Sequence, residues 1–142
     1  MPLESVNETL YTIAATAQGG RSGHVSSEDG VVDLDLGKPG SRSNPVANPE
    51  TLFAAGYAAC FNGALNLVAG QEGLDTSEST VTADVTFGKT DSGFGLAVSL
   101  VARIPGVDAE QAQRLTEKAH EVCPYSKATR GNIDVTLRGE PA

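Results

Sequence analysis

The chain has 142 residues, close to the commonest size of a single domain, so we expect one domain across residues 1–142. Apolar residues make up 39% and charged residues 20% of it, which is typical of a folded globular protein and excludes a disordered chain. The 18 acidic residues outnumber the 10 basic ones, and no run of Lys or Arg occurs, which argues against nucleic acid as a partner.

Two features concern the compartment. The longest apolar stretch, residues 52–69, contains two glycines and two asparagines, and we expect it to be too short and too polar to span a bilayer. The first residues lack the basic-then-apolar pattern of a secretion signal. We therefore expect a cytoplasmic protein with no membrane partner. In that reducing compartment, a pair of cysteines able to close is more often catalytic or redox-sensing than structural.

The N-terminal part of the chain is predicted to form strands. Residues 10–17 are rich in Thr, Tyr and Ile, the pair at 19–20 is Gly-Gly and marks a turn, and residues 21–26 can return as a second strand. Residues 32–36 alternate apolar and acidic side chains, as a third strand does. Residues 37–48 are crowded with Gly, Pro, Ser and Asn and predict a loop.

A long helix is predicted to begin at Asn48-Pro49-Glu50 and to extend to about Gly70. Asn is a favoured N-cap, Pro suits the first helical position, and Glu complements the positive helix end. Residues 81–87 and 94–102 each alternate apolar and polar side chains, which predicts two strands joined by a turn at residues 91–93.

A second helix is predicted to start at Asp108, with Gln111 as its capping-box partner, and to end before Pro124. Residues 133–137 predict a final strand. The order is three strands, a helix, two strands, a helix and a strand. Such segregated runs indicate an α+β domain with a largely antiparallel sheet.

Cys60 lies near the middle of the long predicted helix. That helix is apolar nearly all round, so we expect it to be buried, with small residues that let another helix approach. On this pattern alone Cys60 is interpreted as a core residue, because free cysteine is among the most buried residue types. Cys123 changes the interpretation, since it closes the second helix near its apolar stripe. Two such thiols can form a disulfide if their Cα atoms come within about 7 Å.

A catalytic or redox-active thiol has to be ionised, and a cysteine pKa of about 8.5 leaves only a few per cent as thiolate at neutral pH. Arg21, at the tight turn after Gly19-Gly20, is a candidate cation, although spacing alone favours a solvated turn charge. Glu50 is accounted for by its place at a helix N-terminus. His120, three residues before Cys123, is close enough for a Cys–His pair but is interpreted as a polar-edge residue.

The spacing of Glu50 and Cys60 gives a further inference. Ten residues of unbroken helix separate them by about 15 Å along the axis, which a glutamate side chain cannot bridge. If Glu50 belongs to the site, either the helix deforms or a second subunit supplies the glutamate. A site at the interface of a homodimer is the economical hypothesis.

Two segments carry a family resemblance. Residues 48–61 (NPETLFAAGYAACF) and residues 122–133 (VCPYSKATRGNI) resemble the two signatures of the organic hydroperoxide resistance (Ohr) subfamily of OsmC-like proteins. The turn at Gly19-Gly20-Arg21 also resembles the arginine segment of that family. The similarity extends over essentially the whole chain, and the two long signatures are far more specific than a spaced pair of cysteines.

The resemblance implies an α+β, OsmC-like fold in which antiparallel sheets wrap around the two central helices of an intertwined homodimer. It implies a thiol peroxidase for organic hydroperoxides, with Cys60 as peroxidatic thiol, Cys123 as resolving thiol, and Arg21 and Glu50 completing the site. It implies no cofactor and no metal. The implied reductant is dihydrolipoamide or a lipoylated protein. Phe53 and Phe61 beside the glycine-rich helix face favour alkyl or fatty-acid hydroperoxides as substrates.

Three alternatives use the same residues. A Cys–His hydrolase would pair Cys123 with His120, but no third orienting group or oxyanion turn is recognisable. A zinc site from both cysteines and both histidines has unsuitable spacing, because only His120 and Cys123 are close in sequence. A stress-response or ligand-binding module of the same fold, without turnover, is the remaining non-enzymatic alternative.

Overall fold

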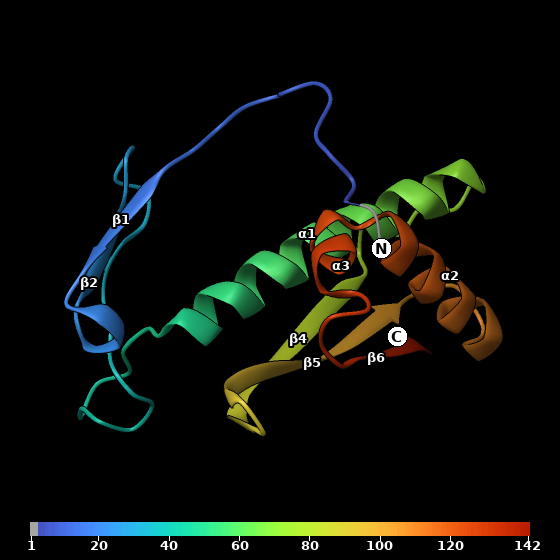
Figure 1. The fold of residues 1–142 in the computed structure, drawn as a ribbon. Coiled ribbons are helices and arrows are strands. Elements are labelled where there is room, and N and C mark those ends of the chain that lie inside the picture. Colours follow the sequence, from blue (N-terminus) through green and yellow to red (C-terminus); the bar gives the residue numbers. More distant parts are fainter. Residues whose placement is uncertain (1–2) are drawn as a thin grey trace. The chain divides into compact units, whose positions relative to one another are not determined.

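In the computed structural model of the chain, which describes residues 3–142, the polypeptide divides into two compact units (Figure 1). One unit ends at Pro49 and the other covers Glu50–Ala142. The expectation of one domain over residues 1–142 stays a prediction.

The N-terminal unit contains a three-stranded antiparallel sheet of β1 (Ala15–Gln18), β2 (His24–Ser27) and β3 (Asp33–Asp35). Gly19 and Gly20 have φ angles of 81° and 64°, which confirms the predicted turn. A single 3-10 turn, η1 (Gly20–Ser22), follows and delays the return strand from the predicted residue 21 to His24. The prediction of strand from residue 10 is wrong for residues 10–14, which pair with no strand of this unit.

This unit has little core of its own. Leu36 is the one large apolar side chain buried within its described residues, whereas Leu10 and Tyr11 are each 84% exposed and Val31 is 82% exposed. A small sheet needs an apolar face packed against another surface to be stable. The structure thus leaves several large apolar side chains of the N-terminal unit exposed.

His24 is held between two carboxylates on the neighbouring strand. Its Nδ1 lies 2.8 Å from Asp35 Oδ1 and its Nε2 lies 2.5 Å from Asp33 Oδ1. The hydrogen bonds, first that of Asp35 and then that of Asp33, raise the pKa of His24 above its ordinary 6.5. This contribution to stability is therefore fully present below about pH 6.5 and is lost as the pH rises through the raised folded-state pKa.

We expect Asp35→Asn to lower the pKa of His24, because the substitution removes the largest of these effects. An NMR titration of the His24 ring protons in both proteins measures the two midpoints. Asp29→Asn, in the same unit but not bonded to His24, is the control. Equal midpoints for Asp35→Asn and the parent chain would contradict the prediction.

The C-terminal unit is a mixed α and β structure (Figure 1). Its sheet has the strand order β4-β5-β6, with β4 at Thr80–Thr90, β5 at Gly93–Ile104 and β6 at Val135–Pro141. Its three helices are α1 (Pro49–Gln71), α2 (Ala109–Val122) and α3 (Pro124–Thr129). β4 and β5 form the predicted antiparallel hairpin, whereas β6 runs parallel to β5. The parallel pairing arises because α2 carries the chain back along the sheet before β6 begins. The α+β fold class is as predicted.

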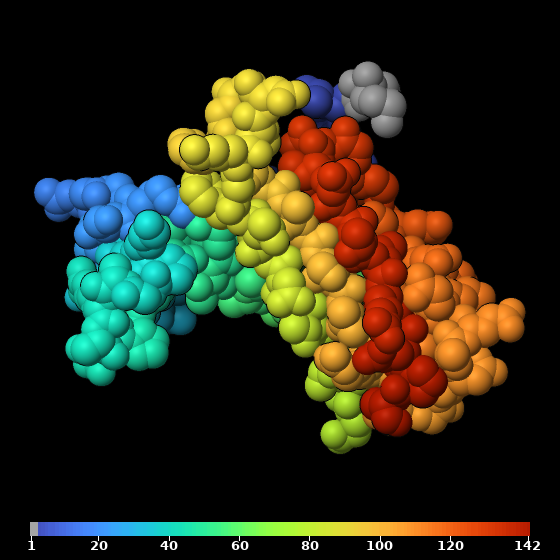
Figure 2. Space-filling view, turned by 90° about the horizontal axis from the view of Figure 1, so that it is seen from below, coloured from blue at the N-terminus to red at the C-terminus, as the bar shows by residue number. Residues whose placement is uncertain are grey.

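The core of this unit lies between one face of the sheet and the helices α1 and α2. It is built from fully or nearly fully buried side chains of α1, β5, α2 and the junction of α2 with α3, among them Tyr57, Phe61, Leu65, Leu100, Ile104, Leu115 and Cys123. Figure 2 shows the opposite face of the sheet, which the helices leave uncovered. Exposed side chains there are mainly polar, as expected for a sheet with one face in water: Thr80, Thr82, Asp84, Thr86, Arg103, Thr136 and Arg138.

The helix α1 is longer than the apolar stretch expected from the sequence. Its 23 residues are long and apolar enough to cross a membrane by length and composition. The expectation that residues 52–69 are too short and too polar to span a bilayer therefore does not hold for the complete helix Pro49–Gln71. A core helix of a globular protein meets the same criterion. Six residues of α1 are buried, while Ala55, Ala59, Gly63 and Leu67, spaced four apart, stay exposed.

Candidate active site

The two cysteines meet in the C-terminal unit. Cys60 lies in the middle of α1, and Cys123 lies at the junction of α2 and α3. Their Sγ atoms are 3.6 Å apart, and both thiols are free. Cys60 is half-buried and Cys123 is fully buried. Because a disulfide has sulfurs about 2.05 Å apart, an approach of about 1.5 Å would close the pair.

Cys123 is positioned by backbone hydrogen bonds to two helices, because it is both the C-cap of α2 and the N-cap of α3. Its backbone is extended, its N–H donates to Ala119 O at 2.9 Å at the end of α2, and its carbonyl accepts from the Lys127 N–H at 2.9 Å at the start of α3. Pro124, which was expected only to end α2, is also the first residue of α3. The sequence signal for α3 was present, because Pro is favoured at the first position of a helix.

Opposing effects act on the pKa of the Cys60 thiol. Burial raises its pKa above the ordinary value, while a hydrogen bond from the backbone N–H of Tyr125 lowers it; contact with the Cys123 thiol raises it further. The raised pKa means that Cys60 within this unit is mainly a neutral thiol at neutral pH. A positive charge supplied to Cys60 would favour the thiolate.

Aromatic rings line the α1 face beside Cys60. The Tyr57 ring lies 5.7 Å from the Tyr125 ring and 5.9 Å from the Phe53 ring, centroid to centroid. Gly56 makes room for Tyr125, since a Cβ at this position would lie 2.8 Å from its hydroxyl oxygen. Phe61, expected at a substrate pocket, is fully buried in the core instead. The accessible rings near the thiol are thus those of Phe53 and Tyr125, both only partly exposed.

The structure does not bring the two other predicted residues to Cys60 within one unit. Arg21 lies in η1 of the N-terminal unit, where its side chain is exposed. Glu50 lies in the first turn of α1, and α1 continues without a break to Cys60, so the separation along the axis is about 15 Å. The Nδ1 of His120 lies 2.8 Å from Ser126 Oγ, so this nitrogen is hydrogen-bonded to Ser126 and not to Cys123.

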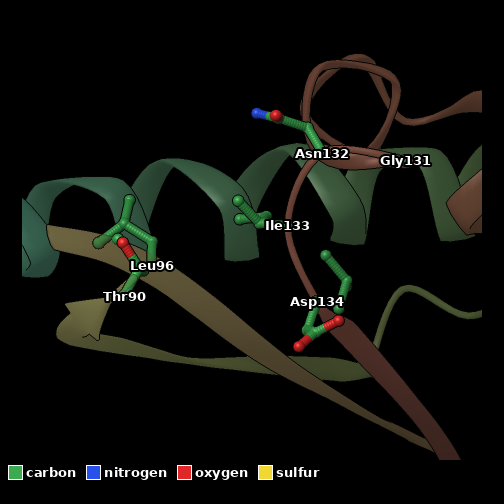
Figure 3. Close-up of a pocket in the computed structure, with 8 residues that line it drawn as sticks. Thr90, Leu96, Gly131, Asn132, Ile133 and Asp134 are labelled. Atoms are coloured by element: carbon green, nitrogen blue, oxygen red, sulfur yellow. The ribbon is translucent and has the colours of Figure 1, made fainter. Parts of the chain in front are cut away.

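An open pocket of about 610 Å³ lies elsewhere in the C-terminal unit. Figure 3 shows its walls: Thr90 and Leu96 of the β4–β5 hairpin on one side, and residues 131–134 before β6 on the other. Gly131 has a φ of 78° and turns the chain at this point. Neither cysteine lines this pocket, so it is separate from the thiol pair.

Known proteins share both the sequence and the fold. Residues 42–138 match the model of the family described as OsmC-like protein. An organic hydroperoxide resistance protein of Xanthomonas axonopodis pv. citri is 48% identical over 139 residues, which cover 95% of this chain and 98% of that protein.

Two crystal structures have the same fold at high identity. An organic hydroperoxide resistance protein from Elizabethkingia anophelis aligns with a TM-score of 0.87 and 55% identity, covering 95% of this chain and 99% of the other. OhrB of Bacillus subtilis aligns with a TM-score of 0.86 and 47% identity, covering 94% of this chain and all of the other (100%). The chain therefore belongs to the OsmC-like family and, within it, to the organic hydroperoxide resistance (Ohr) subfamily.

Proposed function

We propose that this protein is a thiol peroxidase that reduces organic hydroperoxides to alcohols, with Cys60 as the peroxidatic and Cys123 as the resolving thiol. The observation that carries the proposal is the 3.6 Å contact between the two sulfurs, one half-buried and one fully buried. Relatives named for organic hydroperoxide resistance support the substrate class.

The chemistry runs in three steps. The Cys60 thiolate attacks the terminal peroxide oxygen, the O–O bond breaks, and the alkoxide leaves and takes up a proton, which leaves a sulfenic acid on Cys60. The Cys123 thiol then attacks the Cys60 sulfur, forming a disulfide and releasing water. A dithiol attacks that disulfide, is itself oxidised to a disulfide, and returns both cysteines to thiols.

The first step needs a cation near Cys60, because burial raises the pKa of that thiol. Arg21 is the candidate: a guanidinium stabilises both the thiolate and the charge on the leaving alkoxide. Glu50 would orient the guanidinium through carboxylate hydrogen bonds.

A homodimer accounts for the distance between these groups. With about 15 Å of helix between Glu50 and Cys60 of one chain, a second copy can supply Glu50 and Arg21 to Cys60. The exposed apolar side chains of the N-terminal unit and the exposed small residues of α1 supply surface for such a contact. We place the protein in the cytoplasm, with dihydrolipoamide or a lipoylated protein as its reductant.

The accessible Phe53 and Tyr125 rings favour an alkyl tail on the substrate. Burial of about one methylene contributes roughly 0.8 kcal/mol, which hydrogen peroxide cannot gain. Alkyl and fatty-acid hydroperoxides are therefore the proposed substrates.

Intact-mass analysis after one equivalent of tert-butyl hydroperoxide tests the proposal. We expect a loss of two hydrogens, which peptide mapping assigns to a Cys60–Cys123 disulfide. A stable gain of one oxygen without a disulfide would contradict the resolving role of Cys123.

Arg21→Met is expected to raise the pKa of Cys60 further, because it removes the cation proposed to favour the thiolate. The midpoint of the pH dependence of Cys60 alkylation by iodoacetamide, measured in a Cys123→Ser background, should move to higher pH. Arg103→Met, which removes an arginine from the polar face of the sheet, is the matched control. An unchanged midpoint for Arg21→Met would remove Arg21 from the site.

A further inference from the structure

A chain of buried hydroxyl groups joins the helices that carry the two cysteines. The hydroxyl oxygen of Tyr57 on α1 lies 2.8 Å from Ser126 Oγ and 3.0 Å from Thr129 Oγ1, both on α3. Ser126 Oγ also lies 2.8 Å from Nδ1 of His120, near the end of α2. Tyr57 and Ser126 are fully buried, so these hydrogen bonds replace water that the groups have lost.

The network spans the same interface as the two sulfurs. Tyr57 lies three residues before Cys60, about one turn of α1 away. His120 and Ser126 lie three residues on either side of Cys123, one in α2 and one in α3. The hydrogen bonds therefore connect the end of α2 and the start of α3, which meet at Cys123, and link both to α1, which carries Cys60.

The direction of each hydrogen bond follows from the number of hydrogens. Thr129 Oγ1 donates to the Ser126 carbonyl at 3.3 Å, so it accepts from Tyr57. Since each hydroxyl has one hydrogen, Tyr57 then accepts from Ser126, and Ser126 accepts from the Nδ1–H of His120. This arrangement satisfies every contact in the chain and assigns His120 the Nδ1–H tautomer.

His120 is itself held in place. The Arg130 guanidinium donates to the His120 carbonyl at 2.7 Å. Burial, and then the charge of Arg130, lower the pKa of His120, against a smaller opposing effect of Glu121. The lowered pKa favours the neutral ring, which needs no counter-ion in this half-buried position.

We propose that His120, Ser126 and Tyr57 form a positioning network that holds Cys123 against Cys60 and thereby sets how readily the pair closes to a disulfide. The inference rests on the proposed function, in which the Cys60 sulfenic acid and the Cys123 thiol condense to a disulfide and water. The competing reaction is a second oxidation, in which another hydroperoxide turns the sulfenic acid into a sulfinic acid and becomes an alcohol. Holding the sulfurs in contact favours the first reaction over the second.

Ser126→Ala and Tyr57→Phe remove the two central hydroxyl groups of the network. We expect each to raise the fraction of Cys60 sulfinic acid formed per turnover by about five- to tenfold, the effect of one lost hydrogen bond. When the protein is equilibrated with a fixed mixture of lipoate and dihydrolipoate, the ratio of protein with both cysteines reduced to protein with the Cys60–Cys123 disulfide should rise by a similar factor. Mass analysis after alkylation measures both quantities, and Ser126→Thr, which keeps a hydroxyl, should restore them.

Thr116→Val is the matched control. It also removes a fully buried hydroxyl, but this hydroxyl lies in α2 and donates to the carbonyl of Ala112 in the same helix, outside the network. We expect both quantities to stay at their wild-type values in this variant. Circular dichroism shows which variants fold, and Tyr57→Phe keeps the aromatic packing if Ser126→Ala does not fold.

Three outcomes would overturn the inference. Folded Ser126→Ala and Tyr57→Phe that match the wild type in both ratios, while the wild type forms its disulfide, would remove the network and leave the proposed function standing. Equal changes in Thr116→Val would show general loosening of α2 instead of positioning. A wild-type protein that forms no Cys60–Cys123 disulfide would overturn the proposed function itself.

Discussion

Replacing Cys60 by serine is expected to abolish the reduction of organic hydroperoxides, with a loss on the order of 10³-fold or more, because the nucleophile itself is removed. A serine hydroxyl stays protonated at neutral pH and cannot form a sulfenic acid or a disulfide. Consumption of tert-butyl hydroperoxide with dihydrolipoamide as reductant measures the effect. Unchanged consumption would favour a stress-response or binding module without turnover.

Cys123→Ser is the matched control for that experiment. It changes the other thiol of the same 3.6 Å contact but leaves Cys60 in place. We expect one normal turnover, followed by accumulation of sulfenic and then sulfinic acid on Cys60, because no thiol is left to resolve the intermediate. Intact-mass analysis separates the two variants: Cys60→Ser gains no oxygen, and Cys123→Ser gains one or two. Sustained turnover in Cys123→Ser would contradict the resolving role.

The helix ends were predicted from local signals, and the structure confirms them. Asn48-Pro49-Glu50 marks the start of α1 at Pro49, and the Gln111 N–H donates to Asp108 Oδ1 at 2.8 Å at the start of α2. Both signals act within a few residues, so their outcome does not depend on distant parts of the chain. The meeting of the cysteines was suggested by the apolar faces of the two helices, but the distance between the sulfurs depends on how α1 and α2 pack.

Other features depend on neighbours that local sequence does not identify. Residues 10–14 have strand-like composition but no regular structure, because a strand forms only with a partner for its backbone. Pro124 was interpreted as a terminator, and α3 was therefore missed together with the Tyr125 N–H bond to Cys60 and the contacts of Ser126. The relation of Arg21 to Cys60 remains a prediction, because it depends on how the N-terminal unit is placed.

Gly139→Ala is expected to destabilise the C-terminal unit by about 3 kcal/mol, at the upper end of the usual cost of overpacking. Gly139 lies in β6 against α2, and a Cβ there would come within 2.2 Å of the Ala112 carbonyl oxygen and 2.3 Å of Thr116 Oγ1. The first of these atoms belongs to the backbone, so α2 and β6 have to move apart. That movement also strains the Gly139 N–H bond to Gln113 Oε1, now 2.7 Å.

Gly88→Ala in β4 provides the comparison, because no atom lies within 4 Å of a Cβ at this position. Alanine has less freedom than glycine in the unfolded chain, so we expect this variant to be unchanged or more stable by about 0.5 kcal/mol. Urea unfolding of the three proteins at one protein concentration gives the free energies directly. If Gly139→Ala unfolds at the same urea concentration as Gly88→Ala, the close packing of α2 on β6 is not a determinant of stability, and the backbone contact of Gly139 with Ala112 can relax without cost.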